Sequence, residues 1–406
     1  MKRIIFVTGL TLWSMGKECG GPAFIQTVNK YLQENWDVYI ISDVYENIDY
    51  DKIPNSHNIT VKKSPFKNWT QKKKIGLLFR YLDHFITNRK FEKEIKKYIV
   101  HGKTLLYAYE IFGVKACERA SRRNNIPLVT RFQGTVLSQY KDTITNRIRR
   151  FPHFQALSTK ADLVIMTDDG TDGLNILNNL NKDNNILFLR NGLELMEKNI
   201  TEFKKNFNRN AFRKQFNVGE DDFLFLTVSR LVEWKHVERA IKAFSNVHKE
   251  KRKTKMIVVG DGEEKNNLQE MAFELGVKDC VYFVGAVEHR EVYKYMISCD
   301  AFLSLYDLSN VGNPLLEAMT LGTCIVTLDV GDTRKLIYND INGILITYDE
   351  IDKLGDILSD LIDCKAKRDL LKKNAEKYAH DNFMTWEQRM EIEYEKVNEL
   401  LKKGMK

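Results

Sequence analysis

Residues 301–319 read AFLSLYDLSNVGNPLLEAM, a short apolar run that breaks into a polar loop and then enters an amphipathic helix. Alternation of an apolar strand, a Gly-containing turn and a helix is typical of parallel sheets covered by helices. Asn313 suits the N-cap of this helix and Pro314 its first helical position. Unpaired N–H groups at such a helix start attract anions. We therefore expect a bound anion to face the backbone of Gly312, Asn313, Leu315 and Leu316.

The same alternation runs through both halves of the chain, which predicts an α/β protein. Each half contains apolar runs short enough for buried strands, separated by periodic helices. Such halves form doubly wound, Rossmann-like domains, and the cleft between two of them is the default ligand site. We expect strands at 2–9, 37–42, 104–109, 127–132, 161–167 and 185–190 in the first half, and at 222–229, 255–261, 280–285, 301–305 and 324–328 in the second.

A polar stretch without strand signals separates the two halves. We predict an N-terminal domain over 1–195, a linker over 196–220 and a second domain over 221–380. The pattern of the final segment, 381–406, predicts a helix with an apolar stripe. Such a stripe must be buried against another element, and we expect the helix to pack on the first domain. The stripe contains Trp386, Met390, Tyr394, Val397 and Leu401.

Composition excludes several classes of protein. A hydrophobic content of 43% with 29% charged residues fits a soluble globular protein, and no apolar run is long enough to span a membrane. The cysteines show no CxxC spacing and the histidines no HExxH pattern, so we expect reduced thiols, no metal site and a cytoplasmic location. The net charge of +8 comes without a nucleic-acid-binding motif, which leaves phosphorylated small substrates or an anionic membrane surface as partners.

Two segments combine basic and aromatic residues, 71–99 and 147–154. A solvated helix face with a charged loop and a patch for an anionic membrane surface explain them equally well. The second interpretation would make the protein peripheral at the inner face of the cell membrane. In 71–99 one helical stripe contains Ile75, Leu78, Phe79, Leu82, Phe85 and Ile86.

Three motifs have the residue types that phosphate binding requires. Gly20 and Gly21 precede the first helix and let a backbone approach a phosphate, although a tight turn explains them as well. Arg230 and Lys235 stand at a strand end, where two cations can clamp a diphosphate, although surface cations are common. Further glycines in VVGDG and YFVGAV mark the ends of strands. The main chain there can bind a nucleotide base, or the glycines can simply form turns.

The order and spacing of these motifs resembles one family. GG before the first helix, SRLVEWK, VGDG, VYFVGAV, SNVGNPLLEAM and VGDTRKLI are together similar to the retaining nucleotide-sugar glycosyltransferases of the GT-B fold, glycosyltransferase family 4 type. The likeness is closest from Asp222 to Ile346. It implies two Rossmann-like domains that face each other across a cleft, with the acceptor on the N-terminal side and the nucleotide sugar on the other.

The resemblance also implies roles for individual residues. Arg230 and Lys235 would bind the donor diphosphate and stabilise its leaving charge, and Glu317 would bind the ribose hydroxyls. Gly20 and Gly21 would close over the diphosphate, and the main chain at Val287 would hold the base. The class requires no metal and no cofactor beyond the nucleotide sugar, because fixed cations and helix dipoles replace it.

Two positions depart from the family pattern. The first of the family's two glutamates is replaced by Ser309, so either Ser309 and Asn310 contact the donor sugar through neutral groups or Asp307 reaches it. The family's histidine in the first domain is replaced by Gln133, a candidate sugar contact that cannot titrate.

The leading hypothesis is a retaining, metal-independent, hexosyltransferase-like enzyme. It would move a sugar from a UDP- or GDP-sugar to a glycan or lipid-linked acceptor in cell-surface polysaccharide or glycoconjugate assembly. The alternative is a nucleotide-sugar-binding protein of the same fold that has lost catalysis, which the changes at Ser309 and Gln133 motivate. A phosphorylase of related fold would need a pyridoxal phosphate lysine, for which the sequence gives no support.

Overall fold

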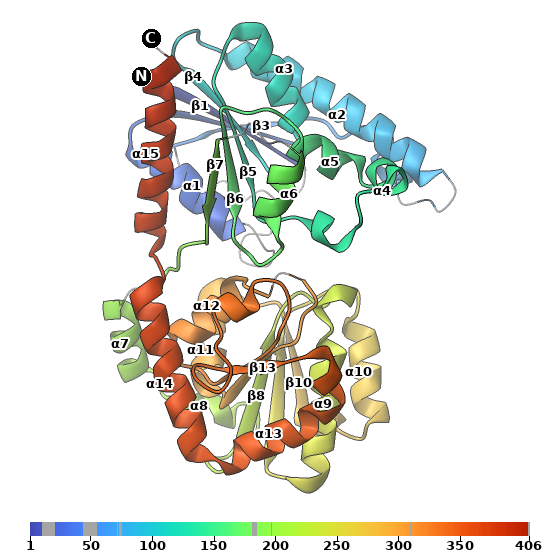
Figure 1. Ribbon diagram of the computed structural model, residues 1–406, viewed down its shortest axis with the longest axis vertical. Helices are drawn as coiled ribbons and strands as arrows, with labels where there is room; N and C mark the ends of the chain where they lie inside the picture. Colours follow the sequence, from blue (N-terminus) through green and yellow to red (C-terminus); the bar gives the residue numbers. More distant parts are fainter. Residues whose placement is uncertain are drawn as a thin grey trace. The chain divides into compact units, whose positions relative to one another are not determined.

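A computed structural model of the chain describes residues 1–9, 21–43, 55–70, 72, 75–180, 185–195, 197–308 and 310–404. The chain divides into two compact units. Unit 1 comprises Met1–Asn191 together with Trp386–Lys406, and unit 2 comprises Gly192–Thr385. In each unit helices cover both faces of a twisted parallel sheet (Figure 1).

Unit 1 contains a seven-stranded parallel sheet in the order β3-β2-β1-β4-β5-β6-β7. The strand order reverses between β1 and β4, and the crevice at the carboxyl ends of two such strands is where ligands bind in open α/β sheets. The strands are β1 (Arg3–Thr8), β2 (Asp37–Ser42), β3 (His57–Thr60), β4 (Thr104–Tyr109), β5 (Leu128–Phe132), β6 (Leu163–Thr167) and β7 (Ile186–Leu189).

Two hydrophobic clusters lie on the two faces of this sheet. One contains apolar side chains of α2, α3, α5 and α6, and the other those of α1 and α15 (Figure 1). Phe24, Val28 and Tyr31 form the apolar stripe of α1 and are fully buried. The helices are α1 (Gly21–Gln33), α2 (Gly76–Tyr98), α3 (Val114–Asn124), α4 (Ile144–Arg149), α5 (Phe151–Leu157), α6 (Gly173–Leu180) and α15 (Trp386–Gly404).

The last helix, α15, is an integral part of unit 1. Its apolar stripe packs on the sheet side that also holds α1, with Trp386, Met390 and Val397 buried. The same face also buries two charged side chains, Arg389 and Glu393, both with no exposed side-chain area. The charges of Arg389 and Glu393 are therefore neutralised inside the unit rather than in water.

A buried ionic network joins Glu393 to the centre of the sheet. Tyr107 of β4 donates a 2.6 Å hydrogen bond to Glu393 Oε1, and Arg131 of β5 lies 3.3 Å from Oε2. Arg389 also pairs with Oε2, and Arg131 donates to the hydroxyl of Thr27 in α1. Among the described residues, Glu393 is the only acid paired with either arginine. One carboxylate thus compensates two buried cations.

Unit 2 contains a six-stranded parallel sheet in the order β10-β9-β8-β11-β12-β13, with the same reversal of order between β8 and β11. Residues 196–220, predicted to be a linker, contain helices α7 and α8 and belong to this unit. The strands are β8 (Phe223–Val228), β9 (Thr254–Val259), β10 (Val281–Gly285), β11 (Ala301–Ser304), β12 (Ile325–Leu328) and β13 (Ile344–Ile346). The helices are α7 (Glu197–Asn206), α8 (Arg209–Lys214), α9 (Val237–Glu250), α10 (Lys265–Glu274), α11 (His289–Ser298), α12 (Asn313–Thr320), α13 (Leu354–Asp363) and α14 (Lys365–Asn382).

The strands predicted from apolar runs are all present, and the α/β class is confirmed. Two edge strands, β3 and β13, were not predicted. Within the residues described above, no helix has the length and apolar character needed to cross a membrane.

Candidate functional site

Lys235 lies beyond the carboxyl end of β8, in the short turn η4 (Glu233–Lys235) that leads to α9. It is only 8% exposed. Its ammonium group lies 4.5 Å from the ring centroid of Trp234 and 4.2 Å from that of Tyr306, and donates to the Leu308 carbonyl oxygen at 3.4 Å. Two aromatic faces and a carbonyl stabilise a partly desolvated cation. The structure therefore fixes a positive charge at the carboxyl edge of the sheet.

Arg230, the second predicted cation, lies two residues after the end of β8 and is exposed. Its guanidinium carbon lies 5.4 Å from the centroid of the same Trp234 ring, so both cations contact one aromatic side chain. Gly260 makes room beside this strand end. Its φ is +134°, and a Cβ there would lie 1.7 Å from the Ser229 carbonyl oxygen. Only glycine lets the end of β9 approach the backbone next to Arg230 so closely.

Asp307, a candidate sugar contact, is bound inside unit 2. Arg239 and the Tyr348 hydroxyl donate to Oδ1 at 2.6 and 3.0 Å, and His236 Nε2 lies 2.7 Å from Oδ2. Burial alone raises the pKa of Asp307, but these hydrogen bonds and the charge of Arg239 lower it below its usual value. Both carboxylate oxygens have partners, so a sugar hydroxyl would have to displace one of them. In the structure Asp307 ties the loop after β11 to α9.

The start of α12 differs from the prediction. Gly312, with extended backbone angles, is the N-cap, and Asn313 is the first helical residue. The N–H groups of Leu315 and Leu316 donate to the Gly312 carbonyl oxygen at 3.0 and 3.3 Å, and both side chains are buried in the core. The expectation that these two N–H groups are unpaired is therefore wrong, because the helix starts at Asn313, one residue earlier than expected, and its first turn closes on Gly312.

Ser309 lies outside the described residues, and its neighbour Asn310 is buried. The Asn310 side-chain amide donates to the Leu328 carbonyl oxygen at 3.4 Å. No described group bonds the Asn310 side-chain oxygen. A buried acceptor without a donor is uncommon in proteins and is consistent with a ligand hydroxyl at this position.

Glu317 in α12 is 2% exposed, and His289 at the start of α11 holds it. His289 Nε2 lies 2.6 Å from Glu317 Oε1, while its Nδ1 lies 3.4 Å from the Tyr293 hydroxyl and 3.9 Å from Glu194. No described residue bonds Glu317 Oε2. A carboxylate with one oxygen fixed and the other unbonded suits a ligand hydroxyl. The sequence analysis did not identify His289, which orients the predicted ribose-binding carboxylate.

We expect His289 to titrate near pH 9. Burial alone lowers its pKa, but the charge of Glu317 and the hydrogen bond to it outweigh burial and raise the pKa from 6.5 to about 9. Because the folded-state pKa is the higher one, the pair stabilises the fold fully below pH 6.5 and loses this contribution as the pH rises through about 9. NMR titration of the imidazole checks the pKa. His289→Gln should remove this part of the pH dependence of unfolding, and a titration at or below pH 6.5 would contradict the pairing.

The remaining donor-site candidates are only partly described. Val287 is half-buried, lies two residues before His289 and packs on the unit 2 core. Gly20 lies outside the described residues, and Gly21 is the first residue of α1. The structure thus brings Arg230 and Lys235 together on one ring and places Glu317 on α12 in the same unit.

In unit 1, Gln133 follows β5 and its side chain is held by three neighbours. The amide nitrogen donates to the Tyr109 hydroxyl at 2.7 Å, and the amide oxygen accepts from Asn191 at 3.1 Å and from Thr167 at 3.4 Å. These bonds fix the amide at the position where the resemblance implies a histidine. Gln133 therefore sits at the carboxyl edge of the unit 1 sheet in a defined orientation.

Glu110 is a candidate that the sequence analysis missed. It follows β4 at the point where the strand order reverses, and its φ of +66° is rare for a residue with a side chain. Its Oε1 accepts the Gln133 N–H at 2.6 Å. Burial raises the pKa of Glu110 to about 7, against the lowering effects of that hydrogen bond and of Arg131. Residues with a strained backbone, and carboxyl groups whose pKa lies near neutrality, are found mostly at functional sites. Glu110 has both properties.

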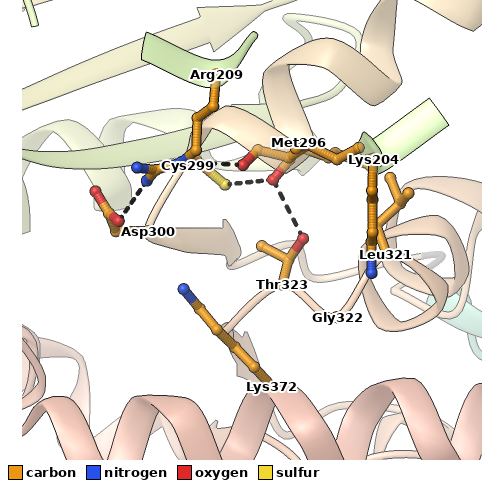
Figure 2. Close-up of a pocket in the computed structure, with 10 residues that line it drawn as sticks. Lys204, Arg209, Met296, Cys299, Asp300, Leu321, Gly322, Thr323 and Lys372 are labelled. Carbon is orange, nitrogen blue, oxygen red and sulfur yellow. Dashed lines mark hydrogen bonds and ion pairs between the residues drawn. The ribbon is translucent and has the colours of Figure 1, made fainter. Parts of the chain in front are cut away.

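A pocket of about 300 Å³ in unit 2 is unrelated to these residues. It lies at the amino edge of the sheet, where Asp300 and Thr323 precede β11 and β12 (Figure 2). Arg209 pairs with Asp300 at 2.7 Å, and Thr323 and Cys299 bond the Met296 carbonyl oxygen (Figure 2). Lys204 on its rim pairs with Glu376. Most of the charged side chains that line this pocket are paired within the protein. The pocket is therefore a weaker candidate for a ligand site than the carboxyl edge of the unit 2 sheet.

Comparison with known proteins gives a match over the second unit. Residues 208–378 match the family described as Glycosyl transferases group 1. The alpha-monoglucosyldiacylglycerol synthase of Streptococcus pneumoniae is 31% identical over 171 residues, which cover 42% of this chain and 38% of that protein. The first curated relatives are each matched over less than two thirds of their own length.

Solved structures match over nearly the whole chain. HepE of Anabaena, in complex with UDP and glucose, aligns with a TM-score of 0.72 and 18% identity over 98% of this chain and 100% of that one. Sucrose-phosphate synthase of Thermosynechococcus elongatus aligns with a TM-score of 0.75 and 17% identity over 98% of this chain and 99% of that one. The two Rossmann-like domains have the GT-B fold, and residues 208–378 are similar to the group 1 glycosyl transferases.

Proposed function

We propose that the protein is a retaining glycosyltransferase that moves a sugar from a nucleoside diphosphate donor to a glycan or lipid-linked acceptor. The observation that carries this proposal is Lys235, a cation held by two aromatic rings at the carboxyl edge of the unit 2 sheet, with Arg230 on the same Trp234 ring. The match of residues 208–378 to group 1 glycosyl transferases supports it.

In this proposal Lys235 and Arg230 bind the departing diphosphate. As the bond between the sugar and the phosphate oxygen breaks, negative charge grows on that oxygen, and fixed cations in a partly desolvated site stabilise it. Arg230 offers a planar fork to phosphate oxygens, whereas Lys235 acts as a point charge. These cations take the place of a metal ion, so we propose that transfer is metal-independent. Undiminished transfer after treatment with a chelator would support this part.

The acceptor hydroxyl attacks the anomeric carbon from the side that the diphosphate leaves, and the departing phosphate oxygen takes its proton. The anomeric configuration is therefore retained. Glu317, oriented by His289, accepts hydrogen bonds from the ribose diol through its unbonded Oε2. Asn310 and Gln133 remain candidate contacts for the donor sugar. No general base is required in this scheme.

The donor and acceptor are proposed at the level of chemical class. HepE, which shares the fold, was solved with UDP and glucose, and the S. pneumoniae relative is by name a synthase of a glucosylated diacylglycerol. We propose a UDP- or GDP-hexose donor and an acceptor in cell-surface polysaccharide or glycolipid assembly on the cytoplasmic side.

A donor screen tests the proposal. The purified protein is incubated with UDP- and GDP-hexoses and with glycan and diacylglycerol acceptors, and products are identified by mass spectrometry. Transfer with the donor's anomeric configuration supports the proposal, whereas inversion would overturn the retaining mechanism.

A catalytically inactive nucleotide-sugar-binding protein is the second candidate. The locked amide of Gln133, which replaces a titratable histidine, is the observation that favours it. Calorimetric binding of a nucleotide sugar without transfer to any acceptor in the panel would select this candidate.

A further inference from the structure

The amino-terminal half of α2 turns its apolar side chains outward. The predicted stripe of six apolar residues at 75–86 is real, but none of the six is buried. Leu78 is 59% exposed, and Ile75 and Phe85 are also exposed. Monomeric proteins rarely leave a contiguous apolar stripe in water, and such stripes mark interaction surfaces.

The opposite face of α2 explains why the apolar stripe stays outside. That face buries Asp83, His84, Thr87 and Asn88 instead of apolar residues. His84 Nε2 lies 2.7 Å from Gln155 Oε1, and Asn88 accepts the Ala116 N–H at 3.0 Å. These hydrogen bonds to α5 and α3 fix the rotation of α2 about its axis. The outward stripe is therefore a feature of the fold and not of a loosely held helix.

Helix α4 extends the apolar surface. Ile144 is 79% exposed, and Ile148 is also exposed. Tyr81 of α2 donates to the Ile148 carbonyl oxygen at 3.2 Å and stacks on Phe151 with ring centroids 3.7 Å apart. The two elements lie side by side in unit 1 (Figure 1). We call this area the α2–α4 surface; its exposed apolar residues are Ile75, Leu78, Tyr81, Phe85, Ile144 and Ile148.

The α2–α4 surface also carries positive charge. Arg80 and Arg89 on α2 and Arg149 on α4 are exposed, and the Arg89 guanidinium covers the Phe85 ring at 4.4 Å. The acids close to it are engaged: Asp142 pairs with Arg147, and Asp83 is buried. Apolar side chains beside arginines that pair with no acid among the described residues match the interface of an anionic bilayer, where the apolar side chains enter the headgroup layer and the cations meet lipid phosphates.

We propose that the α2–α4 surface binds an anionic phospholipid membrane. Charge complementarity selects this occupant over a second copy of the chain, since two copies would bring their arginines together. The proposal goes beyond the proposed function, which assigns only the chemistry of transfer. Its test measures vesicle binding and not sugar transfer. The membrane proposal can therefore fail while the transferase proposal is supported, and the transferase proposal can fail while vesicle binding is observed.

Vesicle cosedimentation at low salt tests the proposal, with vesicles of phosphatidylglycerol and phosphatidylcholine compared with pure phosphatidylcholine. The full chain should bind the anionic vesicles and lose most binding at 0.5 M salt, a condition in which the Debye length falls to roughly 4 Å. Arg80→Gln with Arg149→Gln should lower the partition coefficient about 25-fold, since each surface cation contributes about fivefold. Leu78→Ser with Phe85→Ser should also lower it by at least about tenfold.

Phe273→Ser is the matched control, because Phe273 is 66% exposed on α10 of unit 2 and should not affect binding. Circular dichroism confirms that each variant is folded. Absence of binding to anionic vesicles, or equal binding to neutral ones, would overturn the proposal. Light scattering that shows dimers lost in Leu78→Ser with Phe85→Ser would instead assign the surface to a second copy.

Discussion

Lys235→Met should lower kcat for sugar transfer by about 100- to 1000-fold, the usual cost of removing one group that stabilises transition-state charge. Methionine keeps an unbranched stem between Trp234 and Tyr306 and removes the ammonium group, with its charge and its hydrogen bond to Leu308. Alanine would also leave a cavity between the two rings, so a loss in that variant would mix catalysis with packing. Steady-state kinetics with the donor from the screen measures the effect.

Lys242→Met is the control for this prediction. Lys242 is exposed on α9, seven residues along from Lys235, so the same substitution there should leave kcat unchanged. The KM for the donor should change less than kcat, because the charge that Lys235 meets grows as the diphosphate leaves. Near-normal turnover of a folded Lys235→Met enzyme would show that Lys235 does not take part in transfer.

Glu393→Gln should destabilise unit 1 by about 3–5 kcal/mol, the usual cost of breaking a buried ion pair from one side. The substitution keeps the shape of the side chain but leaves the guanidinium groups of Arg131 and Arg389 without a carboxylate. Hydrogen exchange of β4, β5 and α15 peptides reports on unit 1 separately from unit 2. Exchange in these peptides should accelerate, while exchange in β8 and β9 should not change.

Glu391→Gln gives the matched control on the same helix. Glu391 is half-exposed and pairs with Lys30 at 2.5 Å, and a surface pair of this kind contributes about 0–1 kcal/mol. Replacing Arg131, Arg389 and Glu393 together by apolar residues should recover much of the stability lost in Glu393→Gln. Equal exchange rates in the Glu393 and Glu391 variants would mean that the network contributes nothing to folding.

Apolar patterning predicted the sheets well because both are buried on two faces, which makes their strands nearly continuous apolar runs. Apolar patterning did not predict the edge strands β3 (HNIT) and β13 (ILI), because the first is polar and the second has only three residues. The stripe of α15 was also predicted. Its buried Arg389 and Glu393 were not, because charged residues are normally assigned to the surface unless their partners are known.

The candidate site was predicted unevenly. Arg230, Lys235 and Glu317 lie within sequence motifs, so the sequence alone could nominate them, and their role in a donor site stays a prediction. His289 and Glu110 depend on tertiary contacts: His289 matters because α11 brings it to α12, and Glu110 because its backbone angle and its bond to Gln133 arise only in the folded sheet. A histidine directly after VGAVE, at the predicted strand end, was the available signal for His289.

The position of α15 in unit 1 sets an order for folding during synthesis. All of unit 2 precedes α15 in the chain, so the ribosome completes the sequence of unit 2 before it adds the last element of unit 1. Domains usually fold as units in the order in which they emerge. Here the N-terminal unit must wait, with Arg131 uncompensated, until Glu393 emerges. Unit 2 is therefore expected to fold first on the ribosome, although most of unit 1 is made before it.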